Sequence, residues 1–264
     1  MSAIKSFPSH DAIAFIEQVK NQRPLIHCIT NDVVQNFTAN VLLAIGASPA
    51  MVVAEQEVED FVAIASGLLI NIGTIDSHSA KSMLLAAAKA NQTQTPWVLD
   101  PVAVGSALRY RTDIAKQLLS FKPTVIRANA SEILALSGLQ SSSKGPDGLD
   151  SSDFALNAAT QLAEKYQTIV AITGKVDYVT DGKQVYSITG GDIALTSVTG
   201  TGCSLSAMVA AFIATSKDHL AVTAAACFMM KKAGELANKR QGLGTFAISI
   251  IDQLSLFKQN QNHQ

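Results

Sequence analysis

Cysteine is scarce in this sequence, and no pattern groups the cysteines that it has. Its 264 residues include only Cys28, Cys203 and Cys227, which are far apart, odd in number and without a Cys-x-x-Cys pair. A disulfide framework or a zinc site needs paired or closely spaced ligands. The N-terminal stretch also lacks the continuous apolar segment of a secretion signal. These absences predict a protein of the reducing cytoplasm.

An excess of charge of one sign is missing as well. The sequence has 20 Lys and Arg against 21 Asp and Glu, and the formal net charge is -1. No basic run gives the electrostatic footprint of a nucleic-acid-binding protein. The apolar stretch "AVTAAACFMM" ends at the charged "KKAGELANKR", well short of the roughly 20 residues that a membrane-spanning helix needs. We therefore expect neither nucleic acid nor a membrane as a partner.

Several common catalytic motifs are also absent. There is no Gly-x-Ser-x-Gly elbow, which argues against a serine hydrolase of the α/β class. There is no P-loop, and no Gly-x-Gly-x-x-Gly follows the first apolar run, which argues against the commoner ATPases and dehydrogenases. The five histidines show no metal-ligand spacing.

What the sequence does have is a regular alternation of short apolar, β-branched runs with longer helical patterns. Runs of this kind predict strands over residues 24–30, 47–53, 67–73, 96–100, 123–129 and 168–174, and a hairpin over 177–189. Helical patterns cover 31–45, 55–66, 77–92, 110–120, 129–137, 151–165, 201–216, 219–240 and 243–257. Such alternation predicts an α/β fold with a central, mostly parallel sheet and helices on both faces.

The whole chain, residues 1–264, is expected to form a single domain. Its 48% hydrophobic content is enough for one sizeable core. The segment 138–153, rich in Gly, Ser and Asp, is interpreted as an internal surface loop because neither flank supplies a complete sheet.

Polar residues follow most of the predicted strands. Ligands of an open parallel sheet bind outside the carboxyl ends of its strands, so these residues are expected on one edge. They are Asn31, Glu55, Thr74, Asp100, Asn129 with Glu132 three residues on, and Thr173 with Gly174.

The turn Gly200-Thr201-Gly202-Cys203 opens the first long C-terminal helix. Glycines allow a tight bend, and the start of a helix presents unpaired amides, which together suit an anion such as a transferring phosphoryl group. An ordinary tight turn that caps a core helix explains the same residues. On the glycine pattern alone, the ordinary turn is the better interpretation.

The two acids Asp100 and Glu132 have a structural and a functional interpretation. Asp100 can cap a turn, and Glu132 can complete a capping box with Asn129. On an edge that also carries an anion site, the pair suits Mg²⁺, which takes one or two carboxylates plus substrate phosphates. Arg127 either pairs with an acid of this edge or clamps nucleotide phosphates, and Thr173 either forms a turn or binds a phosphate.

Together these residues resemble a known family. "NASE", residues 129–132, is similar to the Asn-x-x-Glu motif of the ribokinase superfamily, and "TGTGC" resembles its anion-hole motif, which usually has Asp after the second glycine. The segment "PLIHCITNDVVQNFTANVLLAIGASPAMV", residues 24–52, closely resembles the N-terminal signature of hydroxyethylthiazole kinases. "LLINIGT", "WVLDPVAVG" and "VTGTGCSLSAM" match that family in the same order.

The resemblance implies a ribokinase-like α/β fold without the lid of sugar kinases. It implies ATP- and Mg²⁺-dependent phosphorylation of the primary alcohol of 4-methyl-5-(2-hydroxyethyl)thiazole, a reaction of thiamine salvage. It also implies a homotrimer with active sites at the subunit interfaces. The alternative within the superfamily is a hydroxymethylpyrimidine (phosphate) kinase, which shares the Gly-Thr-Gly-Cys turn but opens on a different, Gly-rich first turn.

The resemblance also assigns roles to single residues. Without it, Met51 reads as a buried strand methionine. The implied roles are catalysis for Cys203 with the anion-hole residues Gly200, Thr201 and Gly202; thiazole binding for Met51, Gly200 and, more weakly, Asn31; ATP binding for Arg127, Thr173, Asn129 and Gly174; and Mg²⁺ binding for Asp100 and Glu132.

Cys203 stands where sugar kinases have the Asp that removes the proton from the attacking hydroxyl. A free thiol has a pKa of about 8.5, which a helix N-terminus beside cations lowers and nearby phosphates raise. Because the hydroxyl loses its proton late in phosphoryl transfer, a weak base is sufficient. We expect Cys203 to orient the substrate hydroxyl, with proton acceptance as a second possible role. The structural alternative is a small apolar side chain packed under the turn.

Other classes fit less well. A hydro-lyase that repairs hydrated nicotinamide cofactors on the same fold is expected to keep Asp in place of Cys203. A cysteine-dependent acyl transferase needs a histidine beside the thiol, and no sequence feature brings one there. A binding protein without catalysis needs no acidic pair for Mg²⁺.

Overall fold

The computed structural model of the chain describes residues 3–138 and 152–257. In these residues nine strands form one sheet, in the order β1-β9-β8-β7-β6-β5-β4-β2-β3. The strands are β1 (Ile4–Ser6), β2 (Leu25–Ile29), β3 (Ser48–Ala50), β4 (Gly67–Asn71), β5 (Trp97–Asp100), β6 (Val125–Asn129), β7 (Ile169–Thr173), β8 (Asp177–Thr180) and β9 (Val185–Ile188). All neighbours pair in parallel except β7 with β8 and β8 with β9.

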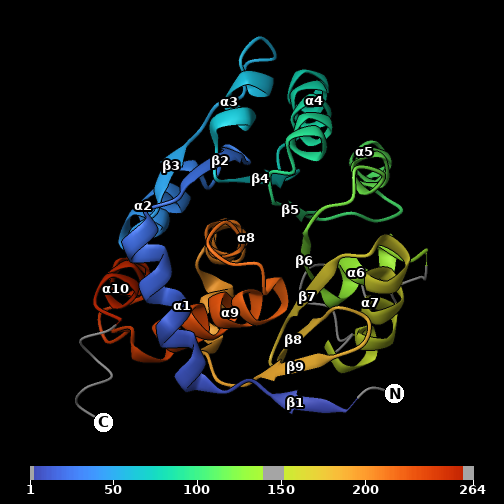
Figure 1. Cartoon of the computed structure of the whole chain (residues 1–264). Helices are drawn as coiled ribbons and strands as arrows, with labels where there is room; N and C mark the ends of the chain where they lie inside the picture. The colour runs from blue at the N-terminus through green and yellow to red at the C-terminus, as the bar shows by residue number, and fades with distance from the viewer. Residues whose placement is uncertain (1–2, 139–151, 258–264) are drawn as a thin grey trace.

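Helices cover both faces of this sheet (Figure 1). Their bounds are α1 (Ser9–Gln22), α2 (Gln35–Ala44), α3 (Val58–Ile64), α4 (Ser77–Thr93), α5 (Arg109–Leu119), α6 (Ala130–Leu136), α7 (Ser152–Tyr166), α8 (Thr201–Ile213), α9 (His219–Leu236) and α10 (Leu243–Ser255), with the 3₁₀ turn η1 (Ile193–Ser197). Helices α1, α2, α8, α9 and α10 lie on one side, and α3 to α7 lie on the other. The predicted α/β architecture with a mostly parallel sheet is confirmed.

Each central strand contributes to two separate cores. In β4, Leu68 and Ile70 pack with helices α3 to α7, whereas Leu69 packs with α8 and its neighbours. Successive side chains of a strand point to opposite faces, so a strand covered on both sides is apolar at every position. This explains why the sequence runs lack a polar alternation.

The first elements, β1 and α1, were not predicted. Ala12, Ile16 and Val19 of α1 are buried at helical spacing. We considered this stretch only as a possible secretion signal, so the spacing was not used to predict a helix. Strand β1 has three exposed residues at the end of the sheet and therefore carries no hydrophobic pattern. The loop predicted over 138–153 lies almost entirely outside the described residues.

Strand β3 is shorter than predicted, and a side chain explains why. It ends at Ala50, and the carbonyl of Val52 lies 2.7 Å from Nε2 of His27, so Val52 bonds to a side chain of β2 and not to the strand ladder. The predicted helices end within a few residues of their predicted bounds, which is a normal difference for helix ends.

The parallel core of the sheet brings the predicted polar residues to one edge. Asn71 and Asp100 are paired neighbours at the ends of β4 and β5, and Asn129 and Thr173 are paired neighbours at the ends of β6 and β7. Asn31 follows β2, the next strand beside β4. The expectation of one polar edge is therefore confirmed for Asn31, Asp100, Asn129 and Thr173, and Asn71 joins them without having been predicted.

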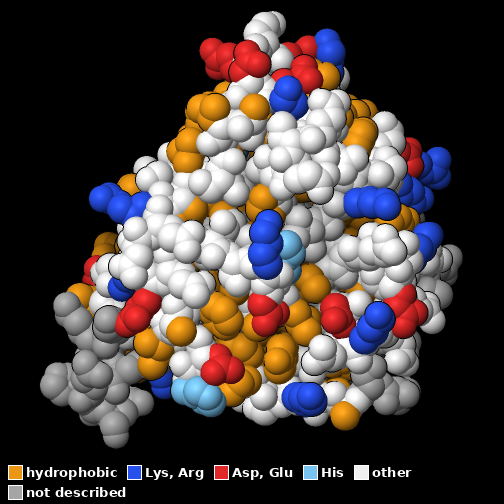
Figure 2. Space-filling view, in the orientation of Figure 1, with side chains coloured by type: hydrophobic (Ala, Val, Ile, Leu, Met, Phe, Trp, Pro, Cys, Tyr) orange, Lys and Arg blue, Asp and Glu red, His pale blue; other side chains and the backbone are white. Residues whose placement is uncertain are grey.

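The surface seen from the same direction is mixed. Acidic side chains gather at the tip of the molecule beside α3, while Lys and Arg side chains are spread over the face (Figure 2). Within the described ranges, no helix combines the length and the apolar character that crossing a membrane requires.

Candidate active site

The turn before α8 has the geometry of an anion site. Gly200 has φ +93 and precedes the first residue of the helix, so it adopts a conformation that favours glycine. A Cβ atom there would lie 3.1 Å from Cγ1 of Val34 and 3.4 Å from Cδ1 of Phe37. The first amides of an α-helix have no partner within the helix, so they are available to a ligand. The hydroxyl of Thr201 instead donates to the carbonyl of Leu195 at 2.8 Å, so this side chain holds the turn.

Arg127 lies directly against this turn. A Cβ atom at Gly202 would be 2.9 Å from Nη1 and 3.1 Å from Nη2 of Arg127, so a larger residue there would push the guanidinium aside. Nη2 donates to Oγ1 of Thr173, and Nη1 lies 3.9 Å from Oδ2 of Asp100. The side chain of Arg127 is only 12% exposed. One cation therefore joins the anion turn, the end of β7 and the end of β5.

A chain of buried hydrogen bonds connects Cys203 to Asp100. Nδ2 of Asn31 donates to Sγ of Cys203 at 3.5 Å and to Oδ1 of Asn71 at 2.9 Å. Nδ2 of Asn71 donates to Oδ2 of Asp100 at 2.8 Å, and the hydroxyl of Ser206 donates to the same oxygen at 2.7 Å. These bonds fix the thiol relative to the carboxylate.

Asp100 is a buried carboxyl with one unsatisfied oxygen. Burial, with a smaller contribution from the charge of Glu132, raises the pKa of Asp100 to about 7 against the opposing effects of Arg127, Ser206 and Asn71. Its Oδ1 is buried without a hydrogen-bond partner. A buried carboxylate oxygen without a donor is costly unless a ligand or ion satisfies it. This oxygen therefore fits a site for Mg²⁺.

Glu132 and Asn129 form the capping box that was the structural alternative. Oδ1 of Asn129 accepts the amide of Glu132 at 2.9 Å, and Oε2 of Glu132 accepts the amide of Asn129 at 2.8 Å. Oε1 of Glu132 accepts the amide of Ala103 at 2.8 Å, and Ala103 has the left-handed φ of 58. Both oxygens of Glu132 thus already have donors. The carboxylate suits Mg²⁺ through water better than through direct contact, since Mg²⁺ usually keeps several waters.

The environment of Cys203 keeps its sulfur protonated. Burial raises the pKa of the Cys203 thiol to about 11, and the charge of Asp100 adds to this, while Asn71, Arg127 and Asn31 act in the opposite direction. From the sequence, a lowering of the pKa of this thiol by the helix N-terminus was possible. Burial outweighs such an effect, so the group is a thiol at neutral pH. This favours the orienting role over the role of a base.

The structure brings some predicted residues together and keeps others apart. Gly174 follows Thr173, but its amide donates to Oδ1 of Asp177 at 3.0 Å. That amide is therefore engaged within the turn. Met51 lies just after β3 and packs against the core on the α8 side.

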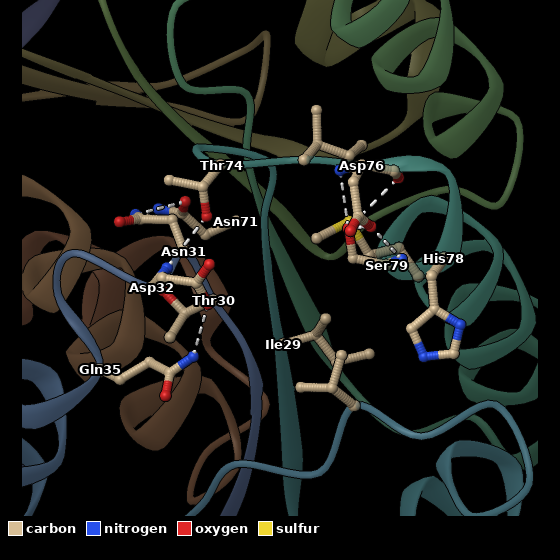
Figure 3. Close-up of a pocket in the computed structure, with 13 residues that line it drawn as sticks. Ile29, Thr30, Asn31, Asp32, Gln35, Asn71, Thr74, Asp76, His78 and Ser79 are labelled. Atoms are coloured by element: carbon tan, nitrogen blue, oxygen red, sulfur yellow. Dashed lines mark hydrogen bonds between the residues drawn. The ribbon is translucent and has the colours of Figure 1, made fainter.

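A pocket of about 140 Å³ opens beside Asn31. Asn31, Asp32, Gln35, Asn71 and Thr74 lie on one side of it, and Asp76, His78 and Ser79 lie on the other (Figure 3). Its remaining lining residues are Ile29, Thr30, Val53, Ile75 and Met83. Met51 is not among these lining residues, whereas Asn31 and Asn71 are. The mixture of apolar and polar groups suits a small, partly polar molecule.

Two residues of the site were not predicted from the sequence. Asn71 links Asn31 to Asp100, and its signal is a polar residue inside the apolar run "GLLINIG". Ser206 follows Cys203 by three residues, which places both on one face of α8. Only the position of Asp100 in space shows that the serine belongs to the site.

Comparisons with known proteins agree with this geometry. The sequence model of the hydroxyethylthiazole kinase family matches residues 16–260. Hydroxyethylthiazole kinase of Leptospira interrogans serovar Lai is 53% identical over 251 residues, which cover 95% of this chain and 94% of that protein. The structure of the hydroxyethylthiazole kinase protein from Pyrococcus horikoshii OT3 has a TM-score of 0.85 and 38% identity, with 93% of each chain covered.

More distant structures share the fold. A ribokinase-like superfamily protein from Enterococcus faecalis has a TM-score of 0.68 at 16% identity, over 93% of this chain and 94% of that chain. This likeness shows the ribokinase-like fold alone. The family match, the close relative and the similar solved structure lead to one conclusion: the chain belongs to the hydroxyethylthiazole kinase family.

Proposed function

We propose that this kinase transfers the γ-phosphoryl group of ATP to the primary hydroxyl of 4-methyl-5-(2-hydroxyethyl)thiazole, as a step of thiamine salvage. The observation that carries the proposal is the convergence of Arg127, Cys203 and Asp100 on the first turn of α8. The names of the relatives support the thiazole alcohol as the substrate. They do not favour the alternative of a hydroxymethylpyrimidine kinase.

The first turn of α8 and Arg127 would stabilise the transition state. In phosphoryl transfer, negative charge is spread over the oxygens of the moving group, and there is little covalent chemistry for the protein to perform. The amides of Gly202 and Cys203 and the helix dipole provide preorganised positive charge. Arg127 adds a full charge beside them and, through Thr173, reaches the turn expected to hold ATP.

Cys203 would hold the substrate hydroxyl in line with the γ-phosphate. Its thiol is anchored by Asn31, whose amide also bonds to Asn71. Because the hydroxyl proton leaves late, Sγ needs only to accept a hydrogen bond from the hydroxyl and to orient it. The thiazole ring would then lie toward Gly200, Met51 and Asn31, the positions that the family resemblance assigns to it.

The acidic pair would hold Mg²⁺. The unsatisfied Oδ1 of Asp100 is the better direct ligand, and Glu132 suits contact through water. Bound Mg²⁺ supplies positive charge to the phosphate oxygens of ATP. Asp100 also accepts hydrogen bonds from Asn71 and Ser206, which fix the orientation of its carboxylate.

A direct assay tests this function. Purified protein is incubated with ATP and either the thiazole alcohol or hydroxymethylpyrimidine, with Mg²⁺ or with EDTA. We expect phosphorylation of the thiazole alcohol only, and only with Mg²⁺. Turnover of the pyrimidine alcohol alone would reverse the substrate assignment, and Mg²⁺-independent turnover would remove the acidic pair from the mechanism.

We also propose the homotrimer with active sites at the subunit interfaces. Val33 is 68% exposed, Ile193 82% and Ile248 65%, so three large apolar side chains face solvent. Helix α10 packs against both α2 and η1, so Ile248 belongs to the same region as the other two. Gly200 contacts Val34 and Phe37 in this region. An interface here would therefore adjoin the anion turn.

Two broader expectations remain proposals. A single domain of residues 1–264 is supported by one sheet that joins all nine described strands. A cytoplasmic location is supported by three cysteines that are free in the structure.

A further inference from the structure

Lys231 of α9 is a buried lysine whose ammonium group is surrounded by oxygen atoms. The residue is 7% exposed. Nζ donates to the carbonyls of Gly174 at 3.0 Å, Lys175 at 3.2 Å and Gly190 at 3.3 Å, and lies 3.2 Å from Oδ1 of Asp177. Burial of a charge is costly unless it is paired and hydrogen-bonded, and this ammonium meets both conditions.

Asp177 completes this arrangement from the other side. It is 3% exposed, and the oxygen that faces Lys231 also accepts the amide of Gly174 at 3.0 Å. The turn between β7 and β8 is therefore held by its amide and by two of its carbonyls. The side chains that hold it come from β8 and α9 and not from the turn itself.

This turn begins at the site. Its first residue follows Thr173, whose hydroxyl accepts a hydrogen bond from Arg127. Arg127 in turn lies against Gly202 of the anion turn. A shift of the β7–β8 turn would therefore move the partner of the cation that serves the moving phosphoryl group.

Lys231 also reaches the segment that leads to the anion turn. The carbonyl of Gly190 belongs to the connection from β9 to η1, and η1 leads to Gly200. Glu235, four residues after Lys231 and on the same face of α9, accepts the amide of Gly191 at 3.0 Å. One helix face thus holds both approaches to the site.

We propose that Lys231 is a positioning residue for ATP, which fixes the β7–β8 turn against the anion turn before α8. It touches neither substrate and acts through Gly174 and Thr173. This inference rests on the proposed function, in which Thr173 and Arg127 bind ATP. The ribose and the α- and β-phosphates would contact the turn that Lys231 holds, and the γ-phosphate would contact the start of α8.

Binding and kinetic measurements on three variants test the proposal. Lys231→Met removes the cation and leaves Asp177 unpaired. The double variant Lys231→Met with Asp177→Asn removes both charges and keeps an acceptor for the amide of Gly174. Lys116→Met is the control, because Lys116 is an exposed lysine in the last turn of α5, on the other side of the sheet. ATP affinity is measured by calorimetry, KM for each substrate by assay, and folding by circular dichroism.

We expect Lys231→Met and the double variant to weaken ATP binding roughly ten- to a hundredfold, the cost of a misplaced binding group. KM for the thiazole alcohol should change less than about threefold, because none of the bonds of Lys231 reaches Asn31 or Met51. A purely structural lysine would lower activity without this difference between the substrates. Lys116→Met should leave both constants unchanged.

Rescue by an added amine gives an independent readout. In Lys231→Ala, ethylammonium should restore ATP affinity, since it brings the missing N–H donors. Tetramethylammonium, which has the charge but no donor, should not restore it.

The outcomes separate the two proposals. If the wild-type protein neither binds ATP nor phosphorylates the thiazole alcohol, the proposed function fails and this inference fails with it. If the wild-type protein does both and a folded double variant binds ATP equally well, only the role of Lys231 is overturned. Loss of the folded spectrum in both variants would show a structural lysine and would also overturn it.

Discussion

The guanidinium of Arg127 occupies the space that a side chain at position 202 would need: Nη1 lies 2.9 Å from where a Cβ atom of that residue would be. This contact links the second glycine of the turn to the cation of the site. A larger residue at position 202 would conflict with this neighbour and not with its own backbone angles, in contrast to Gly200 with its φ of +93.

A methyl group at this position should therefore displace Arg127. We expect Gly202→Ala to lower kcat/KM roughly 10²–10³-fold, the typical cost of losing one preorganised donor to the transition state. Steady-state kinetics measure this. Gly244→Ala is the matched control, because no atom lies within 4 Å of a Cβ atom there. Full activity of Gly202→Ala would show that the contact has no part in catalysis.

The thiol of Cys203 should behave as an unreactive group. Because its pKa is raised to about 11, alkylation by iodoacetamide should be slow near pH 8 and should accelerate only toward pH 11. Mass spectrometry of the alkylated peptide measures this rate. Rapid alkylation of Cys203 at pH 7 would mean a thiolate and would restore the role of a base.

Replacement of the same residue separates its two roles. Cys203→Ala should lower kcat by roughly 10²–10⁴-fold if the group handles the substrate hydroxyl. Cys203→Ser should retain more activity than Cys203→Ala, since a hydroxyl also accepts a hydrogen bond. Equal activity of the alanine variant and the wild-type protein would show that the sulfur only fills space.

The buried Asp100 should make the metal-free protein less stable as pH rises. Its folded pKa of about 7 lies above the unfolded value of about 3.9, so the folded state binds the extra proton. The stabilising contribution is complete below pH 4 and is lost as pH rises through 7, at a cost of roughly 4 kcal/mol. Urea unfolding at several pH values in EDTA measures the slope.

Asp100→Asn should remove this slope and raise stability at pH 8, while it lowers kinase activity. Asp113→Asn serves as control, because Asp113 is an exposed acid on α5. A variant at position 100 that keeps the wild-type slope would contradict the assignment.

The same proton should compete with Mg²⁺. Because protonation removes the charge of Asp100, the Mg²⁺ concentration for half-maximal activity should rise as pH falls from 8 to 6. Titration of activity with Mg²⁺ at each pH measures it. A Mg²⁺ requirement that does not depend on pH would indicate that another group holds the ion.

The proposed trimer depends on the apolar residues around α10. Ile248→Lys should convert the assembly into monomers of 27.8 kDa, because the introduced charge would be buried. Light scattering after size exclusion measures the mass. Ile64→Lys is the control, since Ile64 is 69% exposed on α3. A wild-type protein that runs as a monomer at micromolar concentration would rule the trimer out.

Much of the fold could be predicted, because a parallel strand that is covered on both faces can be recognised from its own run of apolar residues. The apolar runs of β4 and β5 end in Asn71 and Asp100, and parallel pairing alone places such ends side by side. Strand β1 could not be predicted, since three exposed residues carry no period. Its partners in β9 are 181 positions away, as in the pair Ile4 and Val185.

The site was predictable only where a residue type signals its chemistry. Asp100 ends a strand, Cys203 lies in the first turn of a helix, and Arg127 is a charged residue inside an apolar strand. Lys231 is an ordinary lysine inside an apolar helix, and only the approach of three carbonyls shows its place. The raised pKa of Cys203 was not predictable either, because it results from tertiary burial.

Glu132 has a consequence for how this family changes over time. Its two oxygens secure the beginning of α6 and the left-handed Ala103, so a copy of the gene that no longer needed catalysis would still be under pressure to keep the acid. Asp100 would be under the opposite pressure, because replacement of Asp100 would stabilise a protein that no longer needs catalysis. A glutamate at this position is therefore expected for structural reasons alone, whereas loss of the aspartate would remove the proposed direct ligand of Mg²⁺.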